Sequence, residues 1–136
     1  MDIQALMDAI SDGARTARKD YHLTLESMSD KILELGDKSI PVVLDYDRTQ
    51  SVGDLDSYRG YYADLAFQPT STIETADKVL VRLKLAHGST FEGYKGGEFL
   101  MDGDTPLWVA HYGSTGRAII DMQLDNGQLV LITKDI

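Results

Sequence analysis

Glycine is distributed unevenly along this chain, and that distribution constrains the fold more than any other feature. Eight of the twelve glycines lie between residues 88 and 127, where the apolar runs are short. Short apolar runs separated by glycine turns are typical of β-strands joined by tight connections. We therefore expect an antiparallel sheet in the C-terminal half. The expected strands are at Phe91, Phe99–Met101, Leu107–Ala110, Ala118–Ile120 and Leu129–Ile132.

Two turns in this half have specific local signals. Asp125-Asn126-Gly127 predicts a tight hairpin between the last two strands, because Asn and Gly tolerate the left-handed backbone of such turns. Asp102-Gly103-Asp104 predicts a turn between two earlier strands.

Apolar residues at helical spacing predict two helices in the first 36 residues. Thr24 is a good N-cap for the second helix, and Gly36 is at the position expected just past its C-terminal end. Two amphipathic helices joined by a short connection indicate a helical hairpin, or a helix that docks on a sister subunit. The first stripe is Ile3, Leu6, Met7, Ile10 and Ala14, and the second is Leu25, Met28, Ile32 and Leu35.

The middle of the chain mixes strand and helix signals. Residues 40–44 are predicted to form a strand, 45–54 a long polar loop, and 64–67 a short strand that Pro69 ends. Ser71 and Glu74 match a capping box and predict a helix from residue 73 to residue 86. Residues 78–85 also show a strand-like alternation, but the length of the segment and its caps favour the helix.

Taken together, these signals predict one α+β domain spanning residues 1–136. Residues 1–36 would form a helical N-terminal part, and residues 37–136 an α+β core. In that core, one capped helix would pack on a face of an antiparallel sheet. The length of 136 residues is close to the commonest domain size.

Composition excludes several functional classes. The net charge of −9 and the absence of a basic run argue against direct binding of nucleic acid. With no cysteine, the chain has no disulfides, cysteine-ligated zinc or thiol catalysis. No apolar run is long enough to span a membrane, and the N-terminus does not resemble a signal peptide. We therefore expect a cytoplasmic protein.

Catalytic and metal-binding patterns are weak. The sequence has no Gly-x-Ser-x-Gly elbow, and its three histidines lack metal-ligand spacing. Asp45, Asp47 and Asp54 lack the remaining ligands of a calcium loop. We therefore expect no catalytic residue, no metal and no cofactor.

Three segments, centred on Arg59, Lys95 and Arg117, each combine a glycine turn, a cation and nearby tyrosine. Aromatic rings can stack on a base, while guanidinium groups and glycine-turn amides can hold phosphates. Ordinary hairpin loops and well-packed strand entries would leave the same pattern, so both interpretations stay open. The candidate ligand-binding residues are Tyr58, Arg59, Tyr61, Tyr62, Tyr94, Lys95, Trp108, His111, Tyr112 and Arg117.

Several of these strings also carry a family resemblance. Residues 57–66, 90–97 and 105–110, with Tyr112-Gly113 and Thr115-Gly116-Arg117, resemble small proteins encoded by tailed bacteriophages. The resemblance covers residues 24–120. It implies a counter-defence role in the host cytoplasm, similar in style to oligomeric sponge proteins that sequester cyclic nucleotide or cyclic ADP-ribose-like signals without cleaving them.

Three functional hypotheses follow. The first is a non-enzymatic, homo-oligomeric protein that binds and sequesters a small phosphorylated nucleotide signal. The second is an acidic inhibitor that mimics nucleic acid and captures a basic host defence enzyme. The third is an enzyme acting on a nucleotide, with His111 as its base.

Overall fold

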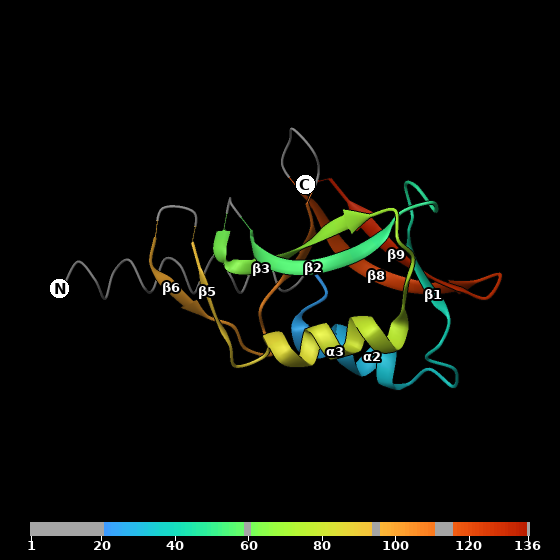
Figure 1. Ribbon diagram of the computed structural model, residues 1–136, viewed down its shortest axis with the longest axis horizontal. Helices are drawn as coiled ribbons and strands as arrows, with labels where there is room; N and C mark the ends of the chain where they lie inside the picture. Colours follow the sequence, from blue (N-terminus) through green and yellow to red (C-terminus); the bar gives the residue numbers. More distant parts are fainter. Residues whose placement is uncertain (1–20, 59–60, 94–95, 111–115, 136) are drawn as a thin grey trace.

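The computed structural model describes residues 21–58, 61–93, 96–110 and 116–135. The predicted first helix lies outside these residues. Within them, the chain forms two helices and nine strands (Figure 1). The helices are α2 (Leu25–Leu33) and α3 (Ala76–Ala86). The strands are β1 (Pro41–Leu44), β2 (Ser51–Tyr58), β3 (Tyr61–Thr70), β4 (Glu74–Thr75), β5 (Thr90–Glu92), β6 (Glu98–Leu100), β7 (Leu107–Val109), β8 (Arg117–Asp125) and β9 (Gln128–Lys134).

The main sheet is mixed, so the prediction of an antiparallel sheet is wrong in part. Its seven strands run in the order β2-β3-β7-β8-β9-β1-β4, and β5 pairs only with β6 in a separate two-stranded sheet. The pairs β3–β7 and β1–β9 are parallel, and the other described pairs are antiparallel. Parallel neighbours need a long crossover. Here the segment from β4 to β6 connects β3 to β7, and most of the chain separates β1 from β9.

The two ends of this sheet meet at Ser51, the first residue of β2. The Ser51 hydroxyl donates to the Val42 carbonyl oxygen of β1 at 2.6 Å and accepts from the Glu74 N–H of β4 at 3.0 Å. The Leu44 N–H also donates to the Gln50 carbonyl oxygen. The sheet therefore curls until β2 reaches the strands at its opposite end.

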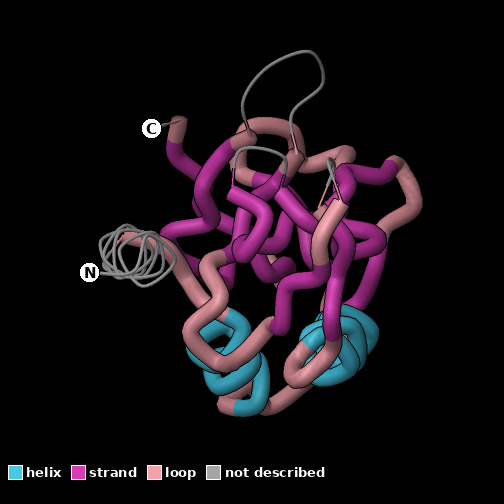
Figure 2. Tube along the Cα trace, turned by 90° about the vertical axis from the view of Figure 1, so that its left-hand side faces the viewer, coloured by secondary structure: helices cyan, strands magenta, loops and turns pink. Residues whose placement is uncertain are grey.

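Both helices cover one side of the curled sheet and lie side by side (Figures 1 and 2). Their apolar stripes and the strands' facing residues form the main core. Thr24 caps α2 as predicted, and Ser27 completes a reciprocal capping box with it. Neither described helix has the length and apolar character needed to cross a lipid bilayer. The largest buried core side chains include Leu25, Met28, Ile32, Leu44, Leu65, Phe67, Leu83, Met101, Leu107, Ile119 and Leu131.

The helix ends differ from the prediction in two places. Helix α2 ends earlier than expected, with Glu34 as its C-cap, so Gly36 is not the closing residue. Helix α3 begins at Ala76 with Thr75 as N-cap, so the capping box predicted from Ser71 and Glu74 is wrong. Glu74 belongs to β4, where its N–H bonds to the Ser51 hydroxyl instead of a helix cap. The choice of helix over strand for residues 78–85 is confirmed.

Strand β2 was not predicted, because residues 45–54 were expected to form a loop, and β3 is longer than predicted. The expected loop ends at residue 50, and β3 continues through Pro69. Pro69 is opposite Val52, and the pairing shifts register between Val52 and Leu55. A proline has no N–H for the sheet, and a bulge beside it is one of the few ways a strand accommodates one.

The predicted hairpin between the last two strands is confirmed. Asp125 pairs with Gln128, and only Asn126 and Gly127 lie between them, with φ of 52° and 76°. Two consecutive positive φ angles define the hairpin turn that matches the twist of the strands. The turn at residues 103–104 is also confirmed, with the Thr105 N–H donating to the Asp102 carbonyl oxygen.

We expect Gly127→Ala to lower the free energy of unfolding by about 1 kcal/mol, because alanine at positive φ meets its own backbone. The matched control is Gly36→Ala, where φ is ordinary and no atom lies within 4 Å of an added Cβ. That variant should change stability by less than about 0.5 kcal/mol. Urea unfolding measures both, and equal losses would contradict the assignment of this turn.

Candidate functional site

Four aromatic side chains pack together on the sheet face opposite the helices, and we call them the aromatic cluster. The members are His22, Tyr58, Tyr61 and Trp108. The rings of Tyr58 and Trp108 are nearly parallel, with centroids 4.3 Å apart and an interplanar angle of 6°. The Tyr61 ring lies 6.1 Å from Tyr58 and 6.0 Å from Trp108. His22 meets Trp108 edge-on at 4.5 Å.

The strand register explains why this cluster forms. Trp108 is opposite Ala66 on β3 and Ala118 on β8, so both of its neighbours are small. Side chains alternate along a strand, and Leu107 and Val109 point into the main core while Trp108 points away from it. The space above the two alanines is filled by the ring of Tyr58, which is buried with Trp108.

Two buried polar contacts fix the orientation of the Trp108 region. The Trp108 indole Nε1–H donates to Asp64 Oδ2 at 2.9 Å, and Asp64 is fully buried. The His22 Nδ1 donates to the Leu107 carbonyl oxygen at 3.1 Å. A buried carboxylate is costly without partners, so the indole hydrogen bond stabilises both groups at once.

Tyr58 also connects two parts of the predicted site. Its hydroxyl oxygen accepts a hydrogen bond from the Gly116 N–H at 2.8 Å. A Cβ on Gly116 would lie 2.7 Å from Tyr58 Cε2 and 2.9 Å from the Val109 carbonyl oxygen, so the close approach requires glycine. Tyr58 immediately precedes residue 59, and Gly116 immediately follows residue 115. The contact therefore brings together the flanks of two of the three predicted segments.

Of the predicted site residues, the structure groups Tyr58, Tyr61 and Trp108. Tyr62 lies in β3, and its side chain is outside the described part. The β5–β6 hairpin, which flanks the third predicted segment, contacts β2 and β3. The predicted residues outside the described part of the chain are Arg59, Tyr94, Lys95, His111 and Tyr112.

Arg117 lies apart from the aromatic cluster. It is opposite Val109, a core-facing residue, and therefore points to the other face of the sheet from Trp108. Its Nε donates to the Thr133 hydroxyl at 2.8 Å, and the Thr133 hydroxyl donates to Asp45 Oδ1 at 2.7 Å. The guanidinium carbon also lies 5.3 Å from the centroid of the Tyr46 ring, a cation–π contact. These contacts link β8 and β9 to the end of β1.

Sequence reasoning missed His22, Asp64 and Gly116 as parts of this region. His22 falls between the two predicted helices in the sequence, and its ring contacts Trp108 and Leu107, far along the chain. Asp64 could have been recognised from the sequence, because a carboxylate at the start of the apolar run 64–67 needs a buried hydrogen-bond partner. Gly116 was recognised as a turn residue, but its close approach to Tyr58 depends on the pairing of distant strands.

Comparisons with protein-family models, curated proteins and solved structures gave no match for this chain. Function is therefore inferred from the side chains themselves. In the described ranges, no group of three or more His, Asp or Glu side chains is arranged to hold a metal ion. The described residues offer one exposed tyrosine ring, Tyr61, packed beside the buried rings of Tyr58 and Trp108.

We expect Tyr58→Phe to lower the free energy of unfolding by about 1 kcal/mol near neutral pH, because the ring stack remains while the buried Gly116 N–H loses its acceptor. Burial raises the pKa of the Tyr58 hydroxyl, although the Gly116 hydrogen bond offsets part of that rise. A folded-state pKa above the unfolded value of about 10 means that this stabilisation is complete below that pH and is lost as pH rises further.

Consequently, the stability gap between the wild type and Tyr58→Phe should shrink above about pH 10. Urea unfolding at neutral and alkaline pH measures the gap. Tyr21→Phe is the control, because it removes the hydroxyl of an exposed tyrosine. If Tyr58→Phe is as stable as the wild type at neutral pH, or loses no more stability than Tyr21→Phe, the Tyr58 hydroxyl does not hold Gly116 in solution.

Proposed function

We propose that this chain is a non-enzymatic protein that binds and sequesters a small phosphorylated nucleotide, a cyclic nucleotide being the preferred class. The observation that carries the proposal is the hydrogen bond between Tyr58 and Gly116 within the aromatic cluster. It supports a site in which the flanks of residues 59–60 and 111–115 meet beside an exposed tyrosine ring.

The base would stack on Tyr61. This side chain is 45% exposed, whereas Tyr58 and Trp108 behind it are buried. Because the buried rings restrict Tyr61, little side-chain entropy is left to lose when a base stacks on it. Base–aromatic stacking contributes about 1–3 kcal/mol. Tyr58 and Trp108, predicted as ligand-binding residues, would therefore not contact the base. They are stacked on each other and would support Tyr61 from behind.

The phosphates would be held by groups next to the cluster. Arg59 follows Tyr58 directly in the sequence, and Ser114 and Thr115 precede Gly116. Guanidinium, hydroxyl and backbone N–H groups are the usual ligands of phosphate in proteins. The chain has a net charge of −9, and a cation that directly follows Tyr58 in the sequence would favour an anionic ligand over a cationic one.

Sequestration without cleavage agrees with the resemblance to small tailed-phage proteins, which we take to indicate a counter-defence role in the host cytoplasm. A sponge needs affinity and a defined stoichiometry, and it needs no base or metal to transform its ligand. We propose a homo-oligomer, in which residues from neighbouring copies complete the site.

Isothermal titration calorimetry with a panel of cyclic nucleotides and ADP-ribose isomers tests this function. At least one ligand should bind, and Tyr61→Ala should weaken its binding by about tenfold or more through the lost stacking. Tyr46→Ala is the matched control, because Tyr46 is 41% exposed but contacts Arg117 rather than the aromatic cluster. Its affinity should stay within about twofold of the wild type.

Two results would contradict the proposal. One is no heat with any ligand of the panel. The other is a loss of binding in Tyr46→Ala but not in Tyr61→Ala, which would place the site at Arg117. Chromatography of the recovered ligand separates a sponge from an enzyme, since a sponge returns its ligand unchanged.

A further inference from the structure

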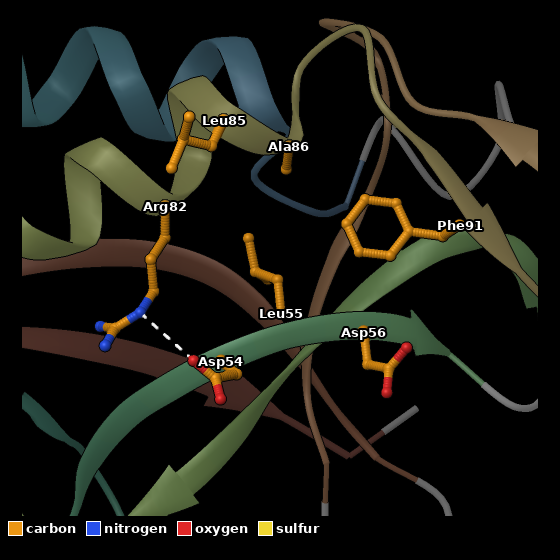
Figure 3. A pocket seen from close by; sticks show the side chains of 7 residues that line it. All are labelled: Asp54, Leu55, Asp56, Arg82, Leu85, Ala86 and Phe91. Atoms are coloured by element: carbon orange, nitrogen blue, oxygen red, sulfur yellow. Dashed lines mark ion pairs between the residues drawn. The ribbon is translucent and has the colours of Figure 1, made fainter.

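A second surface lies away from the aromatic cluster, along β2 (Figure 3). It is an open pocket of about 460 Å³ between β2, the C-terminal end of α3 and β5. In Figure 3, the side chains of Leu55 and Phe91 point into this space from two different strands. The residues that line it are Asp54, Leu55, Asp56, Arg82, Leu85, Ala86 and Phe91.

The pocket runs along β2, which is an edge strand among the described strands. Asp54, Leu55 and Asp56 are consecutive and all line it. Leu55 packs against the main core, and the exposed residues Asp54 and Asp56 alternate with it along the strand, so the pocket lies beside both. Among the described strands, β2 is at the end of the sheet order and pairs in the sheet with β3 alone. Ser51, the first residue of β2, contacts β1 and β4. Residues 54–56 lie farther along the strand and line the pocket.

Apolar side chains form the walls of the pocket and carboxylates form its rim. Leu85 is 70% exposed, an unusual position for a leucine, and it faces the same opening as Phe91. Asp54 and Asp56 are both exposed. The charge of Arg82 is balanced by Glu74, at 3.1 Å, and by a longer contact of 3.8 Å with Asp54. The rim is therefore acidic on balance.

This charge argues against a second copy of the chain as the occupant. Two copies pairing through β2 about a twofold axis would place the acidic residues of one strand against those of the other. Like charges directly opposite one another destabilise a strand pair, and charged edge residues are a common device against self-association. The same two carboxylates attract a strand that carries lysine or arginine.

We propose that the outer edge of β2 at residues 54–56 binds an extended basic segment of another protein, which adds a strand to the sheet. One apolar side chain of that segment would enter the pocket between Leu55, Leu85 and Phe91. Lysine or arginine side chains beside it would pair with Asp54 and Asp56. Addition of a strand supplies backbone hydrogen bonds, while the pocket and the rim supply specificity for alternate side chains.

A fluorescein-labelled peptide of eight residues, alternating lysine and valine with one central leucine, is the probe. Fluorescence anisotropy at low ionic strength should show saturable binding that weakens as salt is added. The peptide with glutamate in place of every lysine should not bind. In a hydrogen-exchange experiment, backbone amides of residues 54–56 should exchange more slowly when the lysine peptide is present.

Two variants test the pocket and the rim separately. Leu85→Ser should weaken binding by about fivefold or more, because it removes apolar surface from the pocket wall. The double variant Asp54→Lys with Asp56→Lys should abolish the salt-dependent part of binding. The matched control is Val81→Ser, which changes another exposed aliphatic residue of α3, 55% exposed, that does not line the pocket. It should bind the peptide like the wild type.

Three results would overturn the proposal: no saturable binding, equal losses in Leu85→Ser and Val81→Ser, or binding without protection of the β2 amides. If the wild type forms a dimer and the double variant Asp54→Lys with Asp56→Lys does not, the edge of β2 binds a second copy of the chain instead. None of these outcomes depends on nucleotide binding, because the aromatic cluster shares no residue with this pocket.

Discussion

The stacking of Tyr58 on Trp108, together with the hydrogen bond from Gly116 to the Tyr58 hydroxyl, is the contact on which the candidate site depends. It crosses from the edge strand β2 over β3 and β7 to the flank of β8. Trp108 is opposite the small residues Ala66 and Ala118, which leaves room for the stacked rings, and Asp64 accepts a hydrogen bond from the indole. This contact joins the flanks of two predicted ligand-binding segments directly.

Strand β2 carries both of the surfaces for which we propose a role. Its last residue, Tyr58, joins the aromatic cluster, and its middle residues line the pocket beside α3. Ser51 joins the start of β2 to β1 and β4, and the pocket lies farther along the strand, at residues 54–56. A ligand on the cluster and a peptide on the edge would therefore contact different parts of the same strand.

Local features of the fold could be predicted from the sequence, and long-range ones could not. The Asn126-Gly127 turn, the Thr24 cap and the choice of helix for residues 78–85 depend on neighbouring residues, and each was correct. The parallel pairs depend on which distant strands meet. The same is true of β4, which pairs with β1 and includes Glu74, so the capping box predicted from Ser71 and Glu74 does not form. At the site, three of the predicted aromatic residues, Tyr58, Tyr61 and Trp108, lie together. The strand register that places Arg117 on the opposite face could not be predicted from the sequence.

The central claim is that a nucleotide binds against the aromatic cluster, and the chain's single tryptophan gives a direct measurement of it. The Trp108 indole N–H is one resolved signal in a proton–nitrogen correlation spectrum, and it reports on the Asp64 hydrogen bond behind Tyr61. During titration with the cyclic nucleotide and ADP-ribose panel, we predict that this signal shifts progressively with at least one ligand and saturates. A signal that stays in place with every ligand, in a protein whose remaining spectrum shows it to be folded, would contradict the account.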